Sequence, residues 1–189
     1  MCDIPIVIFS GGKSSRMGKD KALLPFAQYN SLAQYQYERL SKNFKYVYIS
    51  TKTNKFDFEA NIILDIDYQT SSPLIALISS LEFLKTDNIF ILSVDAPFVD
   101  ITTIMNIINQ HQIKYDASIA KSPYGLEPLC GLYSLKILPI AKQELEKNNH
   151  SLRAMLTKAK TQFIEFNQKK IFTNLNYPTD YKQALSLLD

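Results

Sequence analysis

One segment, residues 6–24, constrains the fold of this chain more strongly than any other. It opens with Ile6 to Phe9, a continuous apolar run rich in β-branched residues, which is typical of a strand buried on both faces. Gly11 and Gly12 then end the strand. Two adjacent glycines accept positive φ and leave no Cβ in the way of a ligand, so successive backbone N–H groups can point at an anion. The segment therefore predicts a buried strand that leads into an anion-binding turn.

The residues after the two glycines carry an excess of positive charge. Lys13, Arg16, Lys19 and Lys21 are accompanied by a single acidic residue, Asp20. Such a loop is suited to phosphate, and the phosphates of a nucleotide are the most economical explanation. A glycine turn with a solvated basic face is the alternative interpretation.

Spacing separates the known kinds of phosphate loop. A P-loop requires Gly-x-x-x-x-Gly-Lys-Ser/Thr, and Val7 stands where its first glycine should be. A dinucleotide fingerprint requires Gly-x-Gly-x-x-Gly, and the next glycine after Gly12 is Gly18. The order that remains from Gly11 is Gly-Gly-x-Ser-x-Arg-Met-Gly-x-Asp-Lys. It resembles the signature of the nucleotidyltransferases that make molybdenum cofactor dinucleotides, and most closely that of the molybdenum cofactor guanylyltransferase (MobA-like) family.

The rest of the chain alternates strand and helix patterns. Strands are predicted at 46–51, 61–64, 88–94, 117–120, 128–133 and 162–166, and helices at 31–43, 72–84, 137–145, 152–159 and 179–188, with another helix beginning near residue 101. Repeated strand–helix units predict an α/β fold, a three-layer, mostly parallel Rossmann-like sheet with helices on both faces, as in nucleotidyltransferases. At 189 residues, the chain is expected to form a single domain, 1–189.

Asp95 is the strongest candidate for a metal ligand. It follows the apolar run 89–94 and precedes Pro97, so its carboxylate should emerge at the end of a strand. Ligands of such sheets bind beyond the carboxyl ends of the strands, and a hard carboxylate there suits magnesium. Asp95 could instead cap the helix near residue 101 or close a turn. The MobA-like family carries an Asp-x-Pro at this place, and the resemblance implies that Asp95 holds Mg²⁺.

The resemblance also implies roles for other positions. The backbone of the first turn would hold base and phosphates, two cations would stabilise charge on the phosphates, and a carboxylate after the third strand would contact the nucleotide. The residues concerned are Phe9, Ser10, Gly11 and Gly12 in the turn, Arg16 and Lys21 as cations, and Asp65, with Asp67 as the rival carboxylate. Asn174 and Asn176 resemble the asparagines that lie near the cleft of the family, on the side of a possible second substrate.

Two positions depart from the family pattern. The family commonly has Gly-Pro-Leu-x-Gly where this sequence has Ser72-Pro73-Leu74-Ile75-Ala76. The two added Cβ atoms would lie near the base pocket, so they bear on the identity of the base more than on the fold.

The activity that the resemblance implies is transfer of GMP from GTP to the phosphate of molybdopterin, with release of pyrophosphate. Two alternatives stay open at this point. One is a cytidylyltransferase acting on molybdopterin or on a sugar or alcohol phosphate, and the other is a nucleotide-binding module without turnover.

Composition limits the remaining possibilities. A net charge of +3 is too small to predict nucleic-acid binding, and no apolar run approaches the roughly 20 residues of a membrane span. The N-terminus lacks a signal-peptide pattern, so a cytoplasmic location is expected. Cys2 and Cys130 are too few for a disulfide scaffold or a zinc site. The expected partners are the small-molecule substrates GTP and molybdopterin, together with transient contacts to proteins that accept the finished cofactor.

Overall fold

The computed structural model describes residues 2–11, 18–67 and 69–187. Its centre is a seven-stranded sheet in the order β3-β2-β1-β4-β6-β5-β7. The strands are β1 (Ile6–Phe9), β2 (Val47–Thr51), β3 (Ile62–Leu64), β4 (Asn88–Ser93), β5 (Ala117–Ser122), β6 (Gly125–Ser134) and β7 (Thr161–Glu165). β6 runs antiparallel to β4 and β5, and the other pairs are parallel. The predicted mostly parallel sheet is therefore confirmed.

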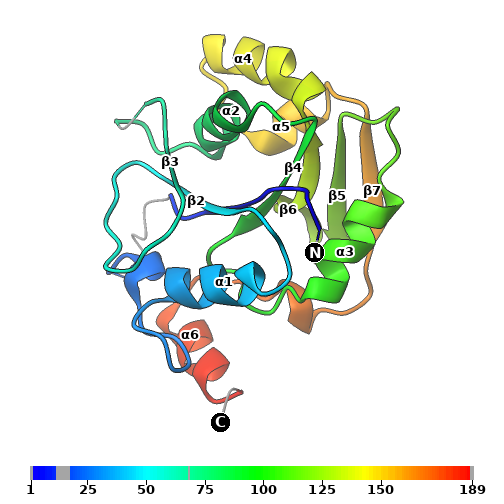
Figure 1. Ribbon diagram of the computed structural model, residues 1–189. Helices are drawn as coiled ribbons and strands as arrows, with labels where there is room; N and C mark the ends of the chain where they lie inside the picture. Colours follow the sequence, from blue (N-terminus) through cyan, green and yellow to red (C-terminus); the bar gives the residue numbers. More distant parts are fainter. Residues whose placement is uncertain (1, 12–17, 68, 188–189) are drawn as a thin grey trace.

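Helices cover both faces of the sheet (Figure 1). One layer contains α1 (Leu32–Ser41), α3 (Ile101–Gln110) and α6 (Pro178–Leu185), and the other contains α2 (Pro73–Leu84), α4 (Leu138–Glu146) and α5 (Leu152–Leu156). Three short 3-10 turns complete the elements: η1 (Lys21–Leu23), η2 (Leu135–Ile137) and η3 (Lys170–Phe172). The three-layer prediction is confirmed.

The first strand joins the two halves of the core. Ile6 and Ile8 pack into the cluster under α1 and α3, whereas Val7 and Phe9 pack into the cluster under α2. All four side chains are buried because successive residues of a strand point to opposite faces and both faces are covered. This is the reason that the run is continuously apolar.

Element ends agree with the sequence patterns where a cap fixes them. Ser31 accepts a hydrogen bond from the Gln34 backbone and begins α1, and Ser72 does the same for Leu74 at the start of α2. The prediction was less accurate in the second half. The helix predicted at 152–159 ends at Leu156, and the strand predicted at 128–133 begins at Gly125.

The early start of β6 reflects an irregularity in its pairing with β5. Ile119 pairs with Gly131, but the next residue, Ala120, pairs with Glu127, so residues 128–130 have no counterpart in β5. Gly131 is required there, because a Cβ would lie 2.5 Å from Ile119 Cδ1 and 2.8 Å from the Ser118 carbonyl oxygen. The Tyr133 hydroxyl donates to the Pro128 carbonyl at 2.6 Å and closes this bulge. Such bulges change where side chains point, which matters at the site described next.

Candidate active site

The carboxyl ends of the parallel strands bring the predicted turn and acidic residues to one edge of the sheet. The Val94 N–H donates to the Phe9 carbonyl at 3.0 Å, so the residue after it, Asp95, emerges beside the end of β1. The Ser10 N–H donates to Ser50, and the Asp65 N–H donates to Thr51, both at 3.0 Å. The ends of β1, β2, β3 and β4 therefore form one continuous rim.

Lys21 and Asp95 meet at the centre of this rim. Lys21 Nζ lies 2.5 Å from Asp95 Oδ2 and 3.1 Å from Asn176 Oδ1. Ser93 Oγ donates to the other carboxylate oxygen of Asp95 at 2.6 Å. The side chains of the ion pair are only 17% and 15% exposed. The cap of α3 is Asp100, so the helix-cap alternative for Asp95 is wrong.

A lysine from a different loop holds the segment that carries Lys21. Asp20 caps η1 by accepting the Ala22 N–H at 3.0 Å through Oδ1. Its Oδ2 lies 2.5 Å from Lys55 Nζ, which also donates to the Ser10 carbonyl at 3.4 Å. Lys55 therefore ties the end of β1 to the start of η1. Sequence reasoning missed Lys55, because no motif marks it.

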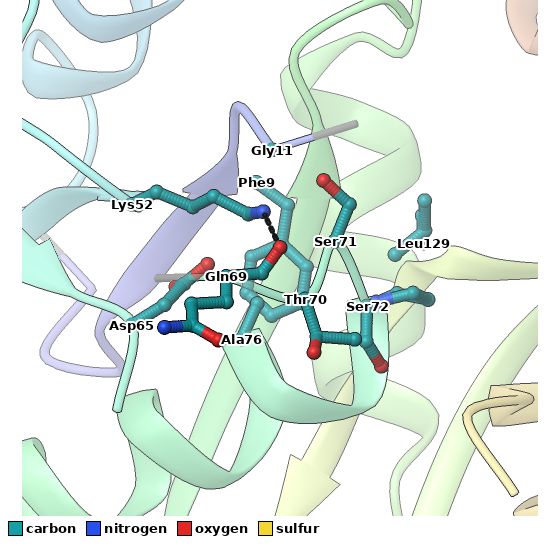
Figure 2. Close-up of a pocket in the computed structure, with 11 residues that line it drawn as sticks. Phe9, Gly11, Lys52, Asp65, Gln69, Thr70, Ser71, Ser72, Ala76 and Leu129 are labelled. Atoms are coloured by element: carbon teal, nitrogen blue, oxygen red, sulfur yellow. Dashed lines mark hydrogen bonds between the residues drawn. The ribbon is translucent and has the colours of Figure 1, made fainter. Parts of the chain in front are cut away.

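The larger cavity, of about 540 Å³, opens on the α2 side of the rim (Figure 2). Figure 2 shows Asp65 and Lys52 on one side of this cavity and Leu129 on the other. Its lining consists of Phe9, Gly11, Lys52, Asp65, Gln69, Thr70, Ser71, Ser72, Pro73, Ala76 and Leu129. The Lys52 ammonium donates to the Gln69 carbonyl at 3.1 Å. The two residues that replace family glycines, Ser72 and Ala76, do lie in this lining.

Asp65 has the features of a ligand-binding carboxylate. Its Oδ1 accepts a hydrogen bond from Ser50 Oγ at 2.8 Å, and its Oδ2 lies beside Gly11, where an added Cβ would be 3.9 Å away. Burial raises the pKa of the Asp65 carboxyl above its ordinary value. Asp67 is used differently, because it accepts the backbone N–H groups of Gln69 and Thr70 and closes their turn. Of the two candidates, Asp65 is the one in the cavity lining.

The smaller cavity, of about 230 Å³, lies next to Asp95 on the α1 and α3 side. It is lined by Ser93, Asp95, Ala96, Val99, Glu127, Pro128, Leu129, Cys130, Phe172, Asn174 and Asn176. The Leu175 N–H donates to the Asp95 carbonyl at 2.9 Å and places the two asparagines there. Leu129 of the bulge lines both cavities and separates them.

Comparisons with known proteins show to which family the chain belongs. The family model for the MobA-like NTP transferase domain matches residues 6–162. The chain belongs to the MobA-like NTP transferase family. It is 38% identical over 187 residues to a molybdenum cofactor guanylyltransferase of Campylobacter jejuni, covering 98% of this chain and 97% of that protein. It is 34% identical over 193 residues to the protein of that name from Helicobacter pylori, covering 98% and 94%.

Solved structures of other proteins have a similar fold. The molybdopterin-guanine dinucleotide biosynthesis protein A of Archaeoglobus fulgidus superposes with a TM-score of 0.83 at 18% identity, over 97% of this chain and 98% of that one. A putative protein of Aquifex aeolicus gives 0.76 at 27% identity, over 92% and 93%. No helix among the described residues is long and apolar enough to cross a membrane.

The structure gathers most of the site residues predicted from the family resemblance. Around the rim and its two cavities lie Phe9, Ser10, Gly11, Lys21, Asp65, Asp95, Asn174 and Asn176. Gly12 and Arg16 lie outside the described residues. No sequence motif marks Glu127 or Leu129, because the bulge in β6 brings them to the rim.

Proposed function

We propose that this protein transfers GMP from GTP to the phosphate of molybdopterin and releases pyrophosphate. The observation that carries this proposal is the junction of Lys21, Asp95 and Asn176, in which residues 74 and 155 positions apart meet at the rim beside the smaller cavity. The curated relatives named molybdenum cofactor guanylyltransferase, which match over nearly the whole chain, support the choice of reaction.

The larger cavity suits the nucleotide. Its volume of about 540 Å³ falls within the roughly 300–1,000 Å³ of ordinary ligand pockets. The backbone around Gly11 can approach the ligand closely, and Asp65 offers an acceptor for hydroxyl or N–H groups of the nucleoside. Gly12 and Arg16 stay predicted phosphate contacts, on the sequence pattern and the family resemblance.

The junction suits Mg²⁺ bound together with the nucleotide. Within the described residues, no group of three or more His, Cys, Asp or Glu side chains could enclose a metal. Mg²⁺ usually takes one or two carboxylates and completes its shell with water and substrate phosphates, which Asp95 could support, with the amide oxygens of Asn174 and Asn176 nearby. When bound, the ion would neutralise charge on the phosphates.

The reaction needs no general base. An oxygen of the molybdopterin phosphate, already anionic, forms a bond to the α-phosphorus of GTP, and the bond between that phosphorus and the bridging oxygen to the β-phosphate breaks. The electron pair leaves with pyrophosphate. The protein contributes positioning and charge, and the Lys21 ammonium is placed to neutralise the anion that develops.

The test is incubation of the purified protein with molybdopterin, MgCl₂ and either GTP, CTP or ATP. We expect GTP alone to be consumed, with stoichiometric pyrophosphate and a product of the mass of molybdopterin guanine dinucleotide. Consumption of CTP would establish the cytidylyltransferase alternative. Nucleotide binding without pyrophosphate release would establish the binding module. Omission of MgCl₂ with EDTA present should abolish turnover.

A further inference from the structure

The smaller cavity contains a carboxyl group to which the GMP-transfer mechanism assigns no role. Glu127 lies on β6 at the start of the bulge, paired with Ala120. Ser122 Oγ donates to its Oε1 at 2.6 Å and fixes the carboxyl at the cavity wall. Among the described residues, no side chain or backbone donor bonds its second oxygen, Oε2. The Oε2 atom is therefore available to accept a hydrogen bond from a ligand in the cavity.

The cavity has the size and walls of a site for one flat ring system. Its volume of about 230 Å³ is below the usual range for whole ligands, so a second nucleotide would not fit inside it. Apolar side chains of Val99, Leu129 and Phe172 in its lining offer surfaces for ring faces, and the lining also contains polar groups. Asp95 and Asn176, which both contact Lys21, line this cavity together with Glu127, which comes from a different strand.

We propose that Glu127 selects the acceptor by accepting hydrogen bonds from the 2-amino-4-oxopyrimidine edge of its pterin ring. This inference rests on the proposed function and names the residue that recognises the second substrate. The exocyclic amino group and the neighbouring ring N–H of a pterin are two parallel donors, and a carboxylate is an acceptor-only group that can receive both. Because Asp95 and Asn176 line the same cavity, a ring held there would leave the phosphate of the acceptor within reach of the junction.

Recognition by a carboxylate predicts a specific discrimination. A lumazine carries an oxygen in place of the 2-amino group of a pterin, so it would set an acceptor against the Glu127 carboxylate. A site built around a charged hydrogen bond loses about ten- to a hundredfold in affinity when that bond is removed. The wild-type protein should therefore bind the pterin more tightly than the lumazine by about this factor.

The experiment compares 6-hydroxymethylpterin monophosphate with its lumazine analogue as ligands. Dissociation constants are measured by ring fluorescence in the presence of MgCl₂ and a GTP analogue with a methylene bridge between the α- and β-phosphates. We expect Glu127→Gln to bring the pterin-to-lumazine ratio close to one while the affinity for the GTP analogue stays unchanged. Glu165→Gln is the matched control, because Glu165 lies on β7, is mostly exposed and pairs with Lys121.

Two results would overturn the inference. One is a wild-type protein that binds pterin and lumazine equally, which needs no variant and so does not depend on folding. The other is a Glu127→Gln variant with an unchanged melting temperature and an unchanged ratio. Failure of the proposed function is a separate result, because it would be seen as absence of GMP transfer to molybdopterin by the wild-type protein.

Discussion

The two cavities are built in different ways, although they share one rim. The larger cavity is formed by residues that directly follow strands of the parallel half, such as Gly11 after β1 and Asp65 after β3. The smaller cavity combines residues that follow β4 with the bulge of the antiparallel strand β6 and a segment near residue 175. Hydrogen bonds from Leu175 to Asp95 and from Lys21 to Asn176 hold that segment in place. The parallel half thus repeats a general rule of α/β sheets, whereas the other half depends on a bulge and on long-range contacts that this rule does not describe.

The largest effect is expected at the junction of Lys21, Asp95 and Asn176, beside the smaller cavity. Lys21→Ala should lower turnover by about a hundred- to a thousandfold, because the cation placed at the reacting phosphates is lost. Asp95→Asn should lower it at least as much. Steady-state pyrophosphate release measures both, and the melting temperature should change little.

Lys142→Met provides the control for the loss of an ion pair as such. Lys142 pairs with Glu82 at 2.6 Å on the helical layer of α2 and α4, away from the rim. The Lys142→Met variant should keep its turnover, because Lys142 lies away from the rim. It should also stay folded, because exposed ion pairs contribute little to stability. Full activity in Lys21→Ala would show that the junction does not carry the chemistry.

The second prediction compares one glycine of the antiparallel half of the sheet with one glycine of the parallel half. Gly131→Ala should lower the free energy of unfolding by about 1–3 kcal/mol, because its Cβ would overlap Ile119 and the Ser118 backbone. Gly11→Ala should cost much less stability, since its Cβ would have only an ordinary contact at 3.9 Å, yet it should weaken GTP binding. Urea unfolding and nucleotide titration measure the two effects. Equal stability losses would contradict the assignment of different roles.

The same contrast explains how far the sequence could predict the molecule. The parallel half was predictable because each apolar run is continuous, caps such as Ser72 mark helix starts, and ligand residues come directly after strands. The bulge was not predictable, since it depends on the long-range fit of Gly131 against Ile119. Asn176 was identified through the family resemblance, but its contact with Lys21 depends on pairing between distant segments, which one sequence does not reveal.

The third prediction concerns Lys55, the lysine that anchors η1 next to the junction. Lys55→Met should lower turnover about tenfold with a smaller change in KM for GTP, because Asp20 and η1 lose their anchor and Lys21 is less well positioned. Lys55→Arg should restore most of the activity, since it can still pair with Asp20. Lys45→Met, which removes an exposed pair with Asp3, is the control. If Lys55→Met keeps the wild-type turnover rate, Lys55 does not position Lys21 for the reaction.

The smallest effect is expected from substitution of Asp65. The substitution should raise the stability of the protein slightly and weaken its binding of GTP. Burial raises the pKa of this carboxyl in the folded protein, so the native state binds more protons than the unfolded state between the ordinary and the raised pKa. Stability therefore decreases as pH rises through that window, and at neutral pH the charged carboxylate is a small cost. Asp65→Asn should raise the melting temperature slightly, because the amide carries no charge and can still accept from Ser50.

The affinity for GTP should change in the other direction. If the Asp65 carboxylate accepts a hydrogen bond from the nucleoside, Asp65→Asn should weaken binding by about two- to tenfold at neutral pH. On acidification, the wild-type affinity should fall as the carboxyl takes up its proton, and the difference between the two proteins should disappear. Titrations of both proteins with GTP over the same pH series measure this convergence. A difference that is constant with pH would mean that the charge of Asp65 has no part in holding the nucleotide.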